Sequence, residues 1–191
     1  MASKTVLSAA KLKAIVPFRP KVALDCEMVG DISDNSMLAR CTVLNYSGQV
    51  LLDTFVEPSR PVYNYRTSWS GITFDLLARH PTLPYKNVHG HNLMTFSSCQ
   101  SKVQSLLTGA IVIGHALYND FQALDIKMPH PELVRDTSTF KDLQTADGKS
   151  QKLKYLAQTY LGRAIQSNGH SSYDDSLAAL DIYKLFSKKW S

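Results

Sequence analysis

The sequence has few cysteines, no long hydrophobic run and no acidic residue near its start. The three cysteines, Cys26, Cys41 and Cys99, are an odd number without CxxC spacing, which argues against a disulfide framework or a zinc site. Reduced thiols in an intracellular protein are the better interpretation. The apolar runs are far shorter than the roughly 20 residues that cross a bilayer, so we expect no membrane segment. The first 20 residues lack a continuous apolar core, so no secretory signal is predicted.

Charge is distributed unevenly along the chain. The formal net charge is +5, from 21 Lys and Arg against 16 Asp and Glu. Residues 1–21 hold five of the basic residues and no acid, so the rest of the chain carries equal numbers of the two signs. The net charge therefore does not by itself indicate a basic nucleic-acid-binding surface. We expect residues 1–20 to form a basic flexible tail.

The remaining residues, 21–191, have the length and composition of one folded domain, since 44% of the chain is apolar and 19% is charged. The expected strands cover 22–24, 38–46, 49–56, 110–114 and 133–136. The expected helices lie at both ends of 73–107 with an irregular stretch over 79–93, from 117 onward, and over 151–161 and 172–189. This order predicts an α/β fold with a mixed sheet, an antiparallel meander followed by parallel strands, flanked by helices.

Two carboxylates stand two residues apart at the end of the first predicted strand. Side chains at i and i+2 leave the same face of a strand, so Asp25 and Glu27 point into one space. Two acids there repel each other unless water or a cation lies between them. On this pair alone, a metal site and a solvated strand end are equally good interpretations.

Two further acids fall on apolar helix faces. Asp120 lies inside the stripe formed by Leu117 and its helical neighbours, and Asp175 lies one turn before Ala179 on the buried face of the last helix. A carboxylate on a buried face is costly unless it is paired, hydrogen-bonded or bound to a metal. For Asp175 the alternative is an N-terminal capping box with Ser172, although such boxes favour Glu or Gln at that place.

His170 is the histidine most consistent with catalysis. It lies in a loop five residues before Asp175, close to an inward-facing acid at a helix start, where it could serve as a general base. His89 and His91 flank Gly90 in a long loop without other ligands, so they are interpreted as loop residues. His115 follows a buried strand and is expected to pack or to hydrogen-bond.

Four acids and a nearby histidine suit one kind of chemistry. Hard oxygen ligands prefer Mg²⁺ or Mn²⁺, and four carboxylates are enough for two divalent cations. Two such ions activate a water and stabilise the leaving oxygen of an in-line phosphoryl displacement. The residues therefore predict metal-dependent hydrolysis of a phosphodiester.

Three blocks of this chain resemble the DEDDh 3′–5′ exonucleases, whose fold is similar to ribonuclease H. The blocks are DCEMVG (25–30), GHALYNDFQAL (114–124) and GHSSYDD (169–175). Further blocks are similar to the branch of interferon-stimulated exonucleases, RNA-exonuclease-four-like proteins and the apoptosis-enhancing nuclease. These are LARC (38–41), YRTSWSGI (65–72) and RDTS (135–138). The resemblance runs from about Lys21 to Lys189.

The resemblance implies roles for individual residues. It makes four acids the metal ligands and catalytic carboxylates: Asp25, Glu27, Asp120 and Asp175. It makes His170 the general base, and it matches Met28 and Arg66 to positions that contact the sugar of the terminal nucleotide. Arg66 would hold a hydroxyl or phosphate, and Met28 would pack against the ribose or base. Residues 79–93 look longer than in typical relatives and are expected to border the substrate groove.

The leading hypothesis is a magnesium- or manganese-dependent 3′–5′ exoribonuclease. It would act on single-stranded RNA, and less well on single-stranded DNA, releasing nucleoside 5′-monophosphates. One alternative is a DNA-preferring 3′–5′ exonuclease, and another is a non-catalytic RNA-binding module on the same scaffold. We further expect a monomer without membrane contact, located in the nucleus or nucleolus by resemblance, with the cytoplasm as the alternative.

Overall fold

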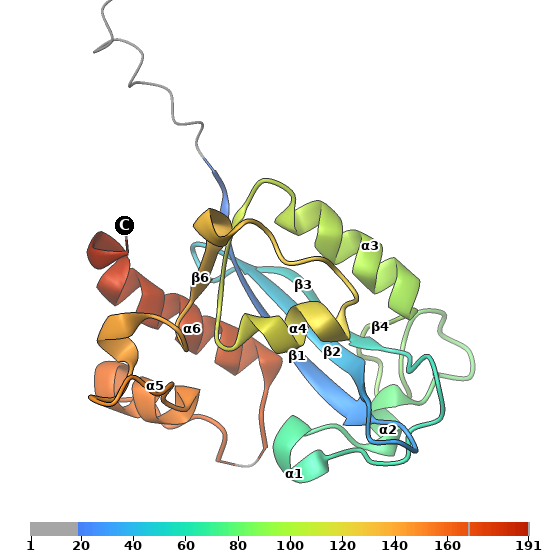
Figure 1. Cartoon of the computed structure of the whole chain (residues 1–191). Helices are drawn as coiled ribbons and strands as arrows, with labels where there is room; N and C mark the ends of the chain where they lie inside the picture. The colour runs from blue at the N-terminus through green and yellow to red at the C-terminus, as the bar shows by residue number, and fades with distance from the viewer. Residues whose placement is uncertain (1–18, 168, 191) are drawn as a thin grey trace, which may run out of the picture.

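A six-stranded sheet forms the centre of the structure, a computed structural model that describes residues 19–167 and 169–190 (Figure 1). The strands are β1 (Lys21–Gly30), β2 (Ser36–Asn45), β3 (Val50–Val56), β4 (Leu93–Met94), β5 (Ile111–Gly114) and β6 (Val134–Asp136). Their order in the sheet is β4-β3-β2-β1-β5-β6. The first three pair antiparallel, and β4, β5 and β6 add in parallel. The predicted α/β class and mixed sheet are confirmed.

Helices pack on both faces of this sheet. They are α1 (Thr67–Ser70), α2 (Phe74–Leu77), α3 (Phe96–Leu107), α4 (Leu117–Ala123), α5 (Leu153–Leu161) and α6 (Ser172–Phe186). Single 3₁₀ turns cover Pro131–Leu133, Lys141–Leu143 and Ser187–Lys189. Figure 1 shows α5 and α6 together on one side of the molecule and α1 and α2 beside the end of β1.

Alternation along β1 decides which residues meet which helices. Leu24 belongs to a core cluster with residues of α3 and α4, whereas Ala23 belongs to a cluster with Leu180 of α6. Because successive side chains of a strand point to opposite faces, Asp25 and Glu27 share the α6 face with Ala23. The sheet therefore directs both acids toward the helix that carries the distant Asp175.

β1 is much longer than the predicted strand over 22–24. It pairs with β2 from Val22 opposite Asn45 to Gly30 opposite Ser36, with a bulge between Glu27 and Met28. The acids consequently lie inside the strand and not at its end. The polar residues interrupt the apolar pattern, so the sequence predicts that the strand ends there. The strand continues because these residues are paired with β2, and pairing between distant segments is not visible in a local sequence pattern.

Most other elements match the sequence prediction. The hairpin, the buried strand of β5, the strand of β6 and the two C-terminal helices lie where they were expected, within a few residues. The first helix predicted within 73–107 is only the short α2, and α1 and β4 were not predicted. The end of α1 depends on Gly71, which has a φ of 67° and whose Cβ would lie 2.8 Å from the carbonyl oxygen of His170.

The irregular stretch 79–93 is organised around one buried side chain. Asn87 is fully buried, and its amide donates to the carbonyl of Leu76 at 2.9 Å. Its side-chain oxygen accepts from the backbone amides of His89 and His91, both at 3.0 Å. The two histidines thus frame a turn, in agreement with their interpretation as loop residues.

Three remaining predictions concern the termini, membranes and thiols. The predicted tail falls almost wholly on residues 1–18, which lie outside the described residues. Within the described ranges, no helix has the length and apolar character needed to cross a membrane. Cys26, Cys41 and Cys99 are buried and free, as the odd count predicts.

Candidate active site

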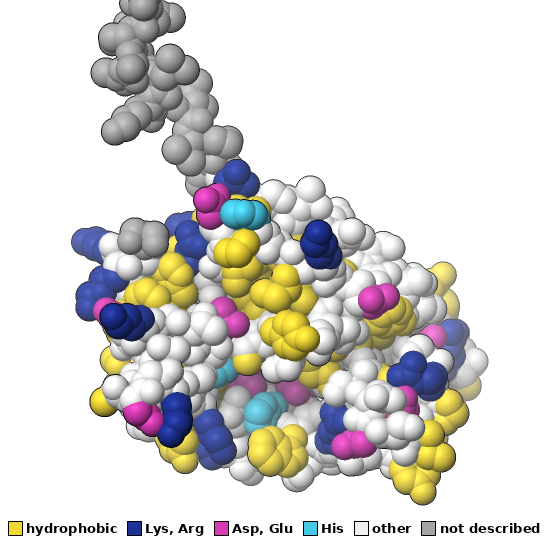
Figure 2. Space-filling model, viewed as in Figure 1, with side chains coloured by type: hydrophobic (Ala, Val, Ile, Leu, Met, Phe, Trp, Pro, Cys, Tyr) yellow, Lys and Arg dark blue, Asp and Glu magenta, His cyan; other side chains and the backbone are white. Residues whose placement is uncertain are grey.

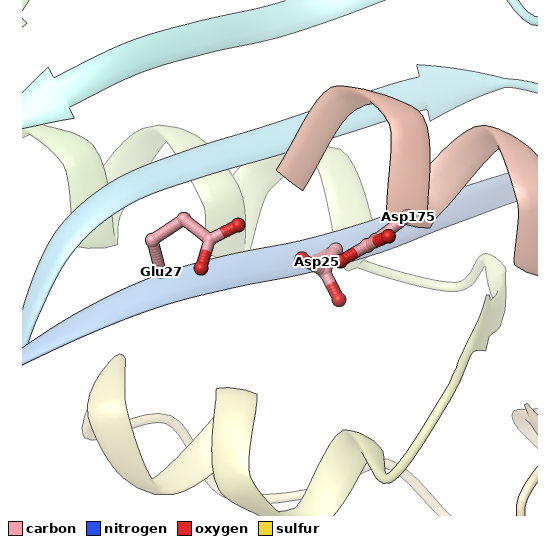
Figure 3. Close-up of side chains that lie close together, drawn as sticks. All are labelled: Asp25, Glu27 and Asp175. Carbon is pink, nitrogen blue, oxygen red and sulfur yellow. The ribbon is translucent and has the colours of Figure 1, made fainter. Parts of the chain in front are cut away.

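Three carboxylates from two elements converge on one point. Asp25 and Glu27 come from β1 and Asp175 comes from the first turn of α6, and one oxygen atom of each lies within 4.8 Å of the others (Figure 3). Asp175 is 2% exposed and Glu27 is 5% exposed. The structure therefore brings together three of the four predicted acids, across about 150 residues of sequence, within the reach of one cation.

The fourth predicted acid approaches from the other side of β1. Asp120 is 3% exposed and lies on α4, which packs on the opposite sheet face from α6. It is not part of the three-carboxylate group, but it lines the same cavity as Asp25 and Asp175. After burial, the negative charge of Asp120 contributes most to raising the pKa of Asp25.

Asp136, from the RDTS block, fixes the start of α4. Its two carboxylate oxygens accept from the backbone amides of Ala116 and Leu117, both at 2.9 Å. Ala116 has a φ of 57°, so the chain turns sharply into the helix at this point. A carboxylate across a helix N-terminus satisfies free amides and complements the helix dipole. Asp136 thereby positions the helix that carries Asp120.

The start of α6 is fixed by two serines. Ser171 is the N-cap, and its side chain accepts from the amide of Asp174 at 3.5 Å. The buried hydroxyls of Ser172 and Thr42 of β2 lie 2.7 Å apart and tie the helix start to the sheet. The alternative interpretation, a capping box of Ser172 with Asp175, is therefore wrong, because the helix begins one residue earlier than that box requires. Asp175 is free to face the cavity.

Burial disfavours the ionised forms of all four acids. It raises the pKa of Glu27 to about 9, and the charge of Asp175 adds to the effect. It raises the pKa of Asp175 itself to about 6. The pKa values of Asp25 and Asp120 are also raised by burial, and at Asp25 by its acidic neighbours as well. Carboxylates this close are unfavourable when ionised unless a cation lies between them.

The protein compensates this cost only in part. Glu27 Oε1 and Asp175 Oδ1 are buried and have no hydrogen-bond partner within the described part of the chain. Arg40 lies opposite Glu27 on β2 and lowers its pKa, but the guanidinium is bound to Asp53 through two bonds of 2.9 Å. Hard, unpartnered oxygen atoms around a common point are what a divalent cation requires. The residues present fit such an ion.

His170 lies at the edge of the acid cluster. Its Nδ1 is 3.4 Å from Asp175 Oδ2, and its backbone amide donates to the carbonyl of Trp69 at 2.6 Å. Its side chain is 33% exposed, so solvent reaches the ring. Burial lowers its pKa, and the positive charge of Lys154 lowers it further. The neutral imidazole is therefore favoured at neutral pH, as a proton acceptor requires.

Gln166 contacts the cluster but was not identified from the sequence. Its side-chain amide donates to Asp175 Oδ2 at 3.0 Å, the same oxygen that faces His170. The residue has a φ of 60°, unusual for a side chain other than glycine, which turns the loop toward the cavity. No spacing pattern could have found it, because the contact depends on the path of a loop.

Two adjoining cavities surround these residues, and we call them together the groove. They have volumes of about 480 Å³ and about 530 Å³ and share five lining residues: Cys26, Met28, Trp69, Asn119 and His170. Figure 2 shows acidic and histidine side chains gathered in a hollow with Lys and Arg side chains nearby. Met28 therefore lies in the wall between the two cavities, and the first of them also contains His115, whose Nδ1 is 2.9 Å from the hydroxyl of Thr137.

Arg66 lies in the second cavity, together with Glu27. Its guanidinium donates to the carboxylate and the carbonyl of Asp34, both at 2.7 Å, and to the hydroxyl of Ser36 at 2.9 Å. The φ of Arg66 is 50°, so its backbone is also held in an unusual conformation. The predicted sugar-contacting residues, Met28 and Arg66, thus both lie in the groove.

Residues 22–183 match the Exonuclease family RNase_T. The chain belongs to this exonuclease family. Among its relatives, the apoptosis-enhancing nuclease of Rattus norvegicus is 40% identical over 178 residues, covering 88% of this chain and 49% of the relative. RNA exonuclease 4 of Cryptococcus neoformans is 40% identical over 173 residues, covering 88% of this chain and 39% of that protein. The predicted branch is confirmed, and the chain spans about half the length or less of these curated relatives.

Solved structures of related exonucleases have the same fold. The Neurospora crassa Pan2 catalytic unit matches with a TM-score of 0.76 at 25% identity, covering 92% of this chain and 28% of the Pan2 chain. The Saccharomyces cerevisiae Pan2 module in complex with AAGGAA RNA matches with a TM-score of 0.75 at 26% identity, covering 96% and 30%. The predicted ribonuclease H-like fold is confirmed.

Proposed function

We propose that this chain is a metal-dependent 3′–5′ exonuclease that hydrolyses single-stranded RNA, and less well single-stranded DNA, to nucleoside 5′-monophosphates. One observation carries the proposal. Three acids of an exonuclease-family chain lie within 4.8 Å of one another beside a histidine, with two buried oxygens unpartnered among the described residues. Two related proteins, RNA exonuclease 4 of Cryptococcus neoformans and the Saccharomyces cerevisiae Pan2 module in complex with RNA, support RNA as the substrate.

In this proposal four acids are catalytic residues that hold two divalent cations, Mg²⁺ or Mn²⁺: Asp25, Glu27, Asp120 and Asp175. When bound, such ions lower the pKa of a water and neutralise charge that develops on phosphate oxygens. Asp25 and Glu27 are held by the paired strands β1 and β2, and Asp175 by the first turn of α6. Rigid elements on three sides therefore orient the ligands in advance.

His170 is the proposed general base. Its Nδ1 faces Asp175 Oδ2 at 3.4 Å, which leaves Nε2 as the nitrogen available to a water molecule. When the ring takes the proton, the adjacent Asp175 carboxylate stabilises the imidazolium. The bond between the His170 amide and Trp69 holds the histidine loop against α1, so the ring stays in place during this transfer.

Arg66 and Met28 are the proposed substrate-binding residues. Four hydrogen bonds to Asp34 and Ser36 engage the Arg66 guanidinium, so one of its five N–H donors is left for a substrate oxygen. A donor held this firmly can discriminate a ribose hydroxyl from its absence. Met28 offers an adaptable apolar surface to the ribose or base.

The substrate preference is tested with matched RNA and DNA oligonucleotides that differ only in the sugar. Wild-type protein is expected to degrade the RNA faster, and Arg66→Ala to lower kcat/KM for RNA by about tenfold more than for DNA. Lys102→Ala, on the exposed face of α3, is the control and leaves both rates unchanged. Faster cleavage of DNA, with equal effects of Arg66→Ala on both substrates, would show a DNA-preferring exonuclease instead.

We also propose that the protein acts as a monomer inside the cell, in the nucleus or nucleolus. The similarity to the RNA exonuclease branch supports the compartment, and three buried free thiols suit a reducing environment. Light scattering of the purified protein tests the monomer, and imaging of the tagged protein tests the compartment. A dimer at micromolar concentration or an exclusively cytoplasmic signal would contradict these two proposals.

A further inference from the structure

Two lysines at the start of α5 line the groove. Lys152 and Lys154 border the first cavity together with Asp25, His170 and Asp175. Neither lysine forms an ion pair with an acid in the part of the chain that the structure describes. The Lys154 ammonium lies 5.2 Å from the centre of the Tyr155 ring, which is 56% exposed. Two unpaired positive charges thus lie on the cavity that holds the acid cluster.

The position of these lysines opposes the ordinary charge preference of a helix. Lys152 is the N-cap of α5 and Lys154 lies in its first turn, where no acidic residue is present and no side chain caps the helix. Positive side chains at the positive end of a helix dipole are unfavourable, and free amides there attract anions. Within the described residues, the amides of Leu153 and Lys154 have no hydrogen-bond partner. An anion bound at this point would accept hydrogen bonds from both amides and would balance the positive charges of the two lysines.

A second observation places a ligand in the same cavity. Asp175 lines this cavity, and its Oδ1 is buried and unpartnered among the described residues, so a cation beside it would provide the missing partner. A phosphate group next to that cation would be held from one side by the metal and from the other by ammonium and amide donors.

We propose that Lys152, Lys154 and the first-turn amides of α5 form a phosphate-binding site. It holds the phosphate that is cleaved and then retained on the nucleoside 5′-monophosphate. The site rests on the proposed function, because that function supplies a phosphodiester to this cavity. Lysine suits the task as a mobile point charge that follows a phosphate through the reaction. These two lysines act as substrate-positioning residues and do not transfer protons.

Product binding tests this site without turnover. Adenosine 5′-monophosphate and adenosine are titrated into the full chain with Mg²⁺ present, followed by calorimetry. The double variant Lys152→Gln/Lys154→Gln is expected to weaken binding of the monophosphate by about tenfold or more and to leave adenosine unchanged. Lys154→Arg keeps the charge and stays within about threefold of wild type. Lys102→Gln, a single exposed lysine on α3, is the matched control, and thermal melts verify that each variant folds.

The outcomes separate this site from the proposed function. Unchanged monophosphate binding in the double variant, or an equal loss in Lys102→Gln, would overturn the phosphate site even if wild-type protein degrades RNA. Equal weakening of adenosine and its monophosphate would also overturn it, because the loss would then concern the nucleoside. If wild-type protein degrades no RNA but shows the predicted phosphate-specific loss, the site stands and the proposed exonuclease reaction fails.

Discussion

At the scale of single residues, the acid cluster carries an electrostatic cost that neighbouring side chains offset only in part. Glu27 and Asp175 are buried side by side, their pKa values are raised, and one oxygen of each is unpartnered among the described residues. A protein tolerates such a group when the free energy of ligand binding offsets the cost of burying the charges. Stability and metal binding should therefore be coupled through these two carboxylates.

This coupling predicts how stability changes with pH. The pKa of Asp175 rises from 3.8 to about 6 on folding and that of Glu27 from 4.5 to about 9, so ionisation favours the unfolded state. The metal-free protein should lose stability as the pH rises from 5 to 8, and Mg²⁺ should restore it at pH 8. Thermal melts in EDTA and in Mg²⁺ measure this, with about 2–4 °C expected per kcal/mol.

A neutral variant provides the control for this experiment. Glu27→Gln removes a buried acid whose pKa is strongly raised, so its metal-free melting temperature should exceed that of wild type at pH 8 and respond less to Mg²⁺. Asp147→Asn, an exposed acid paired with Lys149, should behave as wild type. A wild-type protein that becomes more stable between pH 5 and pH 8 in EDTA would contradict the predicted cost.

Most of the candidate site could be predicted at this scale. Helical phase placed Asp120 and Asp175 on buried faces, and strand alternation placed Asp25 and Glu27 together, because both rules depend only on local backbone geometry. Gln166 could not be predicted, since its bond to Asp175 depends on a loop with a positive φ.

At the scale of secondary-structure elements, each acid depends on how its strand or helix is anchored. β1 is fixed by pairing along its length, α6 by the bond between Ser172 and Thr42, and α4 by Asp136. The α4 anchor is the easiest to test, because Asp136 accepts from two backbone amides at the start of α4 and does not line the groove.

Removing this anchor should weaken both the fold and the site. Asp136→Ala should lower the free energy of unfolding by about 1–2 kcal/mol, as the loss of a helix cap does, and should reduce metal affinity because Asp120 shifts with α4. Urea denaturation and Mg²⁺ titration measure the two effects. Asp142→Ala removes only a surface pair with Lys189 and should cost less than about 0.5 kcal/mol. Equal stabilities of the two variants would refute the anchoring role.

The elements were predicted less completely than the residues. Apolar patterns predicted the hairpin and β5, but they ended the first strand at Leu24. The acids that follow Leu24 interrupt the apolar pattern, whereas the strand itself continues because it is paired with β2 as far as Gly30. The fold of 79–93 escaped prediction because it depends on a single buried amide, Asn87, that reaches across the loop.

At the scale of the whole molecule, charge is the relevant property. Outside residues 1–21 the chain carries equal numbers of acidic and basic residues, and four of those acids belong to the predicted metal site. Two bound divalent cations would add four positive charges, so the metal-loaded body would attract phosphate where the metal-free body does not. The basic N-terminal residues would add to this attraction and not create it.

Deleting residues 1–20 tests whether the basic N-terminal residues add to RNA binding without being needed for cleavage. The shortened protein should bind RNA more weakly, and its affinity should depend less on salt, because fewer counterions are released. Its kcat with Mg²⁺ should stay within about twofold of the full chain, since every groove residue remains. Binding isotherms at several salt concentrations and single-turnover rates measure both quantities. A shortened protein that folds but shows no metal-dependent turnover would contradict the claim that residues 1–20 contribute only to binding.

The most direct measurement of the central claim is degradation of a 5′-labelled single-stranded RNA under Mg²⁺, Mn²⁺ and EDTA. We predict stepwise shortening from the 3′ end with release of nucleoside 5′-monophosphates, no cleavage in EDTA, and a loss of about 10³-fold in kcat for Asp175→Asn. The exposed neighbour variant Asp174→Asn should remain active. Tight RNA binding without turnover in either metal, or undiminished activity of Asp175→Asn, would contradict the claim.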